Sequence, residues 1–126
     1  MSLLAAQPDR RMTSTSIAAS IRTNPVVVRR LLGLLRRSGL VDVSPGPHGG
    51  ATLLHAPETM SLRQVYEAVE HAPVIALHPG TSDDCPVGRY IATVLAKVAD
   101  SAEQALLAQL GTQSVADVVR SLSTAR

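Results

Sequence analysis

Hydrophobic residues recur at three- and four-residue steps in the N-terminal part of the chain, a period that predicts helices. Residues 2–7 read as the end of a helix that Pro8 terminates, so we expect the first helix to be truncated at its start. A second helix is predicted over 14–21, where hydroxyl side chains suited to an N-cap precede Ile17 and Ile21.

The basic segment from Asn24 to Ser38 is predicted to form a third helix. Asn24 suits the N-cap, and Pro25 suits the first helical position because an N–H there would have no intrahelical partner. The apolar and the basic residues of this helix are Val28, Leu31, Leu32 and Leu35, and Arg29, Arg30, Arg36 and Arg37. The second and third helices, joined by a short turn, predict a helix-turn-helix.

Two short apolar runs flank a stretch rich in proline and glycine, which predicts a β-hairpin. Residues 40–43 form the first expected strand, and residues 52–54 form its antiparallel return. Residues 44–50 between them read Ser-Pro-Gly-Pro-His-Gly-Gly, a composition typical of turns. Ser61, followed three residues later by glutamine, then begins a helix through Glu70 with a capping box. A hairpin directly after a helix-turn-helix predicts a wing.

The C-terminal part contains the longest periodic segment of the chain. Residues 71–86 carry three prolines, two histidines and the one cysteine without periodicity, which predicts an irregular loop. A helix over 87–110 would be about 36 Å long. Its apolar stripe calls for a partner helix, most simply from a second copy of the chain, although packing onto its own domain is the alternative. The expected dimerisation residues are Ile91, Val94, Leu95, Val98, Ala102 and Leu106. Ser114 caps a last short helix.

These elements predict a mainly α fold class with a small β-wing. We expect a winged helix-turn-helix domain over 1–70, an effector or sensor loop over 71–86, and a dimerisation helix with a terminal short helix over 87–126. A chain of 126 residues fits one compact domain with one appended element. No apolar run approaches the roughly 20 residues that span a bilayer, and the N-terminus lacks the regions of a secretory signal, so we expect a cytoplasmic protein without a membrane partner.

The charge is unevenly distributed although its net value is only +2. Seven arginines fall in the first third of the chain: Arg10, Arg11, Arg22, Arg29, Arg30, Arg36 and Arg37. Eight of the ten acidic residues follow in the remaining two thirds. This asymmetry indicates one lobe that meets phosphates, whereas a basic helix face that meets only solvent is the alternative.

A basic helix behind a short turn, followed by a wing, suits the recognition of double-stranded DNA. A helix fits the major groove, and arginines and helix N-termini hold phosphates. The expected DNA-binding residues are Ser14, Thr15 and Ser16, then Asn24, Val26, Val27, Arg29, Arg30, Arg36 and Arg37, and in the wing His48 and Gly49. We expect Arg30 to read bases. A winged-helix module that binds proteins without specific DNA binding is the alternative.

Three segments recur in an order shared with one family: residues 35–41 (LRRSGLV), 46–50 (GPHGG) and 61–65 (SLRQV). From residue 13 onward the chain resembles the Rrf2-type winged-helix transcriptional regulators, the family of IscR, NsrR and CymR. The resemblance implies dimeric DNA binding, a long dimerisation helix and an effector region between the wing and that helix. We therefore interpret the chain as a sequence-specific regulator, a repressor acting as a homodimer, and not an enzyme.

The wing departs from the pattern of the family. Members commonly carry arginine just before the Gly-Pro of the wing and an aromatic residue after its Gly-Gly, where this chain has Pro45 and Ala51. Minor-groove insertion by a wing arginine is therefore not expected. His48 at the tip is a substitute donor in one interpretation and a solvated turn residue in the other.

The sensor region departs as well, because cluster-binding relatives have three closely spaced cysteines where this chain has only Cys85. His78 and Asp83 are candidate metal ligands beside Cys85, but the spacing of these three residues is not typical of a metal site. We therefore expect no iron–sulfur cluster, metal or other cofactor. Cys85 precedes Pro86 and the long helix, whose dipole favours a thiolate, whereas the neighbouring aspartates oppose it. Cys85 is interpreted either as a redox sensor or as a buried structural cysteine. A thiol enzyme is not expected, because no base or oxyanion site accompanies Cys85 in the sequence.

Overall fold

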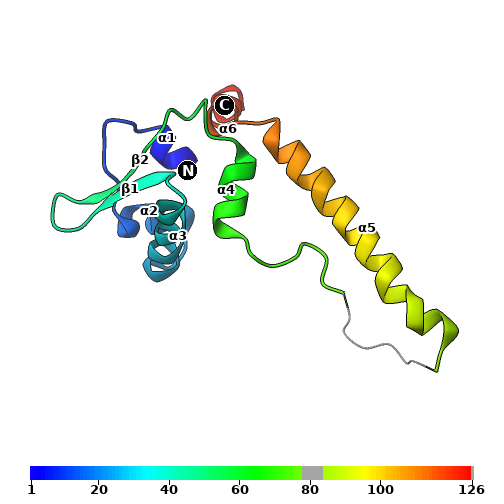
Figure 1. The fold of residues 1–126 in the computed structure, drawn as a ribbon. Helices are drawn as coiled ribbons and strands as arrows, with labels where there is room; N and C mark the ends of the chain where they lie inside the picture. The colour runs from blue at the N-terminus through cyan, green and yellow to red at the C-terminus, as the bar shows by residue number, and fades with distance from the viewer. Residues whose placement is uncertain (78–83, 126) are drawn as a thin grey trace.

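The computed structural model describes residues 1–77 and 84–125. In chain order the elements are α1 (Ser2–Ala5), α2 (Ser14–Ile21), α3 (Pro25–Arg37), β1 (Val41–Ser44), β2 (Gly50–Leu53), α4 (Leu62–Val69), α5 (Pro86–Gly111) and α6 (Val115–Thr124). All of these elements except α5 gather into one body, and α5 extends away from it (Figure 1). The predicted fold class is confirmed: a mainly helical chain with a two-stranded wing and a long C-terminal helix.

Side-chain caps begin both helices of the helix-turn-helix. The Thr13 side chain accepts a hydrogen bond from the Ser16 N–H at 3.1 Å, and the Asn24 side chain accepts one from the Val26 N–H at 2.8 Å. Between the helices, Arg22 adopts a left-handed conformation with φ 53° that turns the chain. The predicted bounds of α2 and the predicted cap of α3 are therefore confirmed, because both depend on residues next to one another in sequence.

The wing pairs β1 with β2 in an antiparallel register that joins Val43 to Ala51. The backbone before α2 adds to this hairpin, because Met12 and Ala51 exchange hydrogen bonds of 3.0 and 2.8 Å. A Cβ on Gly50, at φ +132°, would lie 2.8 Å from the Met12 carbonyl oxygen, and one on Gly49 would lie 2.2 Å from the carbonyl oxygen of Ser44. Both glycines of the wing are thus required by close backbone approaches.

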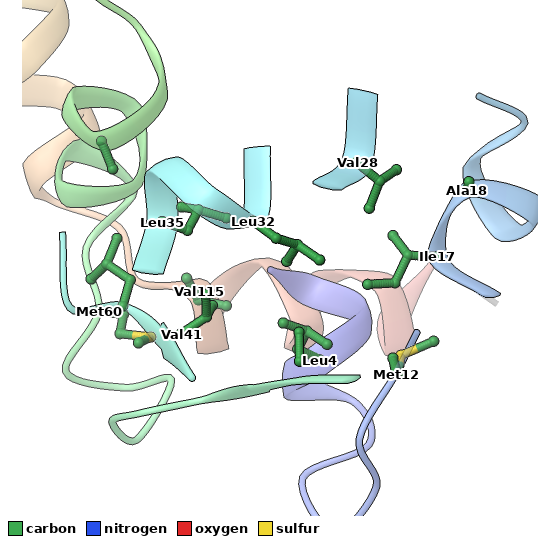
Figure 2. Packing of buried hydrophobic residues seen from close by; sticks show 13 residues of the cluster. Leu4, Met12, Ile17, Ala18, Val28, Leu32, Leu35, Val41, Met60 and Val115 are labelled. Atoms are coloured by element: carbon green, nitrogen blue, oxygen red, sulfur yellow. The ribbon is translucent and has the colours of Figure 1, made fainter. Parts of the chain in front are cut away.

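The hydrophobic core lies between the helix-turn-helix and the wing, where side chains from α1, α2, α3, β1 and α6 converge (Figure 2). Its members include Leu4, Ile17, Val28, Leu32, Leu35, Val41, Ala51, Met60 and Val115. The four α3 positions predicted to face inward divide into buried Val28, Leu32 and Leu35 and half-buried Leu31. The core is aliphatic, as the composition requires.

The C-terminal helix α6 joins this same core. Val115 is 1% exposed, and α6 packs against α1. The Val115 N–H donates to the Met60 carbonyl at 2.8 Å, and the Leu62 N–H donates to the Gln113 carbonyl at 2.9 Å. This helix was predicted to belong with the dimerisation helix in a region over 87–126, whereas in the structure it packs against the body formed by residues 1–70.

The α4 and α5 helices differ in how they use their apolar residues. The predicted capping box of α4 is present, with Ser61 and Gln64 bonded reciprocally, and Ala68 is buried against α3. Among the described residues of α5 none is buried. Val94 and Val98 on its predicted apolar stripe are 54% and 58% exposed. Among the described helices none combines the length and the apolar character needed to cross a membrane.

Candidate nucleic-acid interface

The first turn of α3 presents apolar side chains to solvent. Val26 and Val27 are 60% and 45% exposed, whereas Val28 beside them is 3% exposed and belongs to the core. Exposed methyl groups at the start of a recognition helix suit contact with the methyl group of thymine. The side-chain oxygen of Asn24 caps the helix through its bond to the Val26 N–H, so in this structure Asn24 sets the helix start.

The basic surface of α3 consists of arginines whose charges are not neutralised. Arg29, Arg30, Arg36 and Arg37 are exposed, and none of them forms an ion pair within residues 1–77 and 84–125. Three other arginines of the described chain are paired with carboxylates: Arg11 with Asp42, Arg63 with Glu67 and Arg120 with Asp117. The guanidinium groups of α3 are therefore available to an external anion such as a phosphate.

The start of α2 lies beside this basic surface. Thr15 and Ser16 are exposed, and Ser14 is half-buried. The Ser16 N–H is taken by the Thr13 side chain, while the N–H groups of Ser14 and Thr15 belong to the first turn, which has no intrahelical acceptors. Such a helix start favours an anion, as predicted for phosphate contact.

A cleft of about 410 Å³ separates α3 from the wing. Its lining brings together four of the predicted DNA-binding residues, Ser14, Arg29, Arg36 and Gly49. The other predicted residues do not line it: Thr15, Ser16, Asn24, Val26, Val27, Arg30, Arg37 and His48. The cleft and its lining residue Gly33 were not predicted, although a glycine in the middle of a predicted helix is a signal that the sequence contains.

An ion pair at the base of the wing was also not foreseen. The Arg11 guanidinium lies 2.8 Å from the Asp42 carboxylate and donates to the Gly50 carbonyl at 3.3 Å. It thus joins β1, β2 and the segment before α2. His48 is exposed in the turn, and Ala51, which replaces an aromatic residue of the family pattern, is fully buried at the Met12 bridge. The Ala51 side chain faces the core and not the surface of the wing.

The predicted sensor residue Cys85 is the N-cap of α5, and its thiol is exposed. The alternative of a buried structural cysteine is wrong, because Cys85 is exposed among the described residues. Residues 71–77 of the predicted sensor loop are exposed. The conceivable mixed ligands His78 and Asp83 lie outside the described residues.

The family model of Rrf2, described as an iron-dependent transcriptional regulator, matches residues 1–121. Iron dependence calls for a set of ligands, but within residues 1–77 and 84–125 no three His, Cys, Asp or Glu side chains gather as a metal site. The single cysteine of the sequence also excludes a three-cysteine set within one chain. The described residues therefore do not fit a resident cluster, and that no cofactor is bound stays a prediction.

Relatives and solved structures agree with this assignment. YwnA of Bacillus subtilis, assigned as an HTH-type transcriptional regulator, is 36% identical over 115 residues, which cover 90% of this chain and 86% of YwnA. A solved structure from Lactobacillus plantarum, assigned as a transcriptional regulator, is 25% identical with a TM-score of 0.82 and covers 96% of this chain and 83% of its own.

Two further structures share the fold at 18% identity. They are IscR of T. potens, with a TM-score of 0.73 and coverages of 99% and 81%, and CymR, the global cysteine regulator of B. subtilis, with a TM-score of 0.64 and coverages of 94% and 86%. The predicted resemblance is confirmed. The chain belongs to the Rrf2 family and is a DNA-binding transcriptional regulator, not an enzyme.

Proposed function

We propose that the chain is a sequence-specific repressor that binds duplex DNA as a homodimer, with the outer face of α3 in the major groove. The observation that carries this proposal is the set of four arginines on α3 that form no ion pair among the described residues, while the opposite face of the helix packs into the core. Val26 and Arg30 lie one helical turn apart on the outer face, so Arg30 is the proposed base reader and Val26 a contact for a thymine methyl group.

Selection of bound sequences from a random DNA pool, followed by gel shifts at moderate salt, tests this function. We expect a palindromic site with half-sites about one helical turn apart, and Arg30→Ala is expected to relax the preference at one position of each half-site. Recovery of no preferred sequence would contradict specific binding and favour a module that binds acidic proteins.

Dimer formation through α5 is supported by its uncovered apolar stripe. Val87, Val94, Leu95 and Val98 are all exposed in the single chain. Burying such a stripe against a second copy removes apolar surface from water and sets the spacing of two recognition helices. Sedimentation equilibrium is expected to give twice the mass of the chain, and a concentration-independent monomer would contradict the proposal.

Repression follows from occupancy of a promoter, which excludes polymerase without any additional contact surface. Transcription in vitro from a promoter that contains the selected site measures this directly. We expect less transcript as protein is added, and a rise in transcript would instead identify an activator.

Redox control through Cys85 is proposed because the thiol is exposed at the start of α5, the helix proposed to join two subunits. Oxidation by a peroxide to a sulfenic acid, or further to a disulfide between subunits, would change the geometry of the dimer. DNA affinity of the wild type and of Cys85→Ser, each reduced and peroxide-treated, tests this. Equal responses of both proteins would exclude Cys85 as the sensor.

A further inference from the structure

The cleft between α3 and the wing extends down to the hydrophobic core. Met12 and Leu32, which Figure 2 shows in the core, line it together with the fully buried Ala51. Its volume of about 410 Å³ falls within the range of about 300–1,000 Å³ in which proteins bind small organic molecules. A strongly hydrated phosphate gains nothing from an apolar surface, whereas an apolar ring does. The bottom of the cleft therefore favours an organic ligand.

Bare backbone forms part of both walls of the cleft. Gly33 lies on the α3 side, and Gly46 and Gly49 lie on the wing side. A Cβ built on Gly33 meets no atom within 4 Å, so the space beside the helix is open and packing gives no reason for glycine there. A flat ring approaches bare backbone more closely than a wall of side chains. The walls of the cleft therefore favour a planar molecule.

The polar groups of the cleft are complementary to an anion. Arg29 and Arg36, one turn before and one turn after Gly33, line the cleft, and neither forms an ion pair among the described residues. Ser14 and Ser44 add hydroxyl donors, and none of the described lining residues is acidic. A guanidinium group binds a carboxylate through two parallel hydrogen bonds. An apolar cleft lined by arginines therefore suits an organic acid.

We propose that this cleft binds a small aromatic carboxylate, with its ring on Met12 and Leu32 and its carboxylate on the guanidinium groups of Arg29 and Arg36. Both arginines belong to the surface proposed to bind DNA, so the inference rests on the proposed function where it concerns DNA. A carboxylate bound to these arginines makes them unavailable to DNA. Ligand and DNA therefore exclude each other, and the aromatic acid releases the regulator from its site.

Titration of the DNA-free protein with 1-naphthoate, monitored by the amide chemical shifts in NMR spectra, tests the ligand site. We expect saturable shifts within 12–14, 29–36 and 43–51, with a Kd of about 1 mM, which is ordinary for a molecule of this size. The neutral 1-naphthamide and the ringless acetate should each bind at least about tenfold more weakly. Absence of saturable shifts, or equal binding of acetate or of 1-naphthamide, would overturn the proposal.

Variants of the lining residues separate the charge of the site from its space. Arg29→Gln combined with Arg36→Gln should weaken 1-naphthoate at least about tenfold and leave 1-naphthamide unchanged, because only the acid uses the guanidinium groups. Gly33→Leu fills the cleft without changing charge and should weaken both compounds; if it melts below the wild type, Gly33→Ala replaces it with a smaller expected loss. Arg10→Gln is the matched control, because Arg10 is exposed and does not line the cleft. Wild-type affinity for 1-naphthoate in the folded double variant would overturn the proposal.

Gel shifts with the selected DNA site test the exclusion of DNA by the ligand. At about ten times its Kd, 1-naphthoate should weaken DNA binding by about tenfold relative to the same concentration of acetate. If the wild type binds 1-naphthoate in the cleft but no DNA, the proposed function fails and the ligand site stands. If it binds DNA but not 1-naphthoate, the ligand site fails and the proposed function stands. Binding of 1-naphthoate with unchanged DNA affinity would overturn the exclusion.

Discussion

The helices α3 and α5 both have an apolar side, but the two sides differ in whether the single chain buries them. The apolar side of α3 packs into the core against α2 and β1, so its arginine-bearing side faces solvent. The apolar side of α5 is exposed in the single chain. Folding of the single chain therefore buries the apolar side of α3 but leaves that of α5 exposed, and this difference is the basis of the proposed dimer.

Removing core contacts of α3 should produce the largest change. Leu35 is 6% exposed, and Leu35→Ala leaves a cavity that should lower the free energy of unfolding by about 3 kcal/mol. Urea denaturation monitored by circular dichroism at low protein concentration measures this. Leu95→Ala on exposed α5 serves as the control and should change monomer stability little. Equal losses in both variants would show that α5 packs on its own domain.

Placing charge on the stripe of α5 should disrupt assembly without unfolding the chain. Val94→Glu combined with Val98→Glu puts four carboxylates into the proposed dimer interface, so we expect a monomer by sedimentation. Affinity for a palindromic site should fall by roughly 100-fold, because two separate monomers bind the half-sites independently, whereas in a dimer the first bound domain holds the second one near its half-site. Thr93→Glu lies on the polar side of the same helix and should remain dimeric. A dimeric double variant would place the interface elsewhere.

Gly33 in the middle of α3 is not required by packing, since a Cβ there would meet no atom of the described chain within 4 Å. Gly33→Ala should raise the free energy of unfolding by about 0.5–1 kcal/mol, because alanine is the better helix former and its methyl group meets open space. The reference is Gly50→Ala, which should destabilise the protein, since its Cβ would collide with the Met12 backbone. A destabilised Gly33→Ala protein would mean that the fold itself needs this glycine.

The smallest effect concerns the cap that fixes α6 at the end of α5. Hydrogen bonds from the Ser114 backbone and hydroxyl, followed by that from Arg120, lower the pKa of Asp117 from 3.8 to about 2. A carboxylate with a lowered pKa in the folded state stabilises the protein above its ordinary pKa, and this stabilisation is lost as the pH falls through about 2. Between pH 4 and pH 2, thermal midpoints should therefore fall more steeply for the wild type than for Asp117→Asn. Parallel pH curves would contradict this role.

Much of the candidate site could be predicted because it depends on local chemistry. The caps of α2 and α3, the basic residues of α3 and the close approach of Gly49 to Ser44 each depend on residues within a few positions of one another. The cleft was not predicted because its walls come from three separate segments, which only folding brings together. The exposure of Cys85 likewise depends on what packs around it, and this excluded one of its two interpretations.

The sequence by itself determined the element types, the helix starts and the basic character of α3, because propensity, capping and periodicity act over one or two turns. Only the tertiary structure decided that α6 enters the N-terminal core and that Arg11 bridges both wing strands. Those contacts join residues 31 or more positions apart, and no local pattern encodes such a pairing. It also decided that no described residue of α5 is buried, because burial depends on what packs against the helix and not on its own sequence pattern.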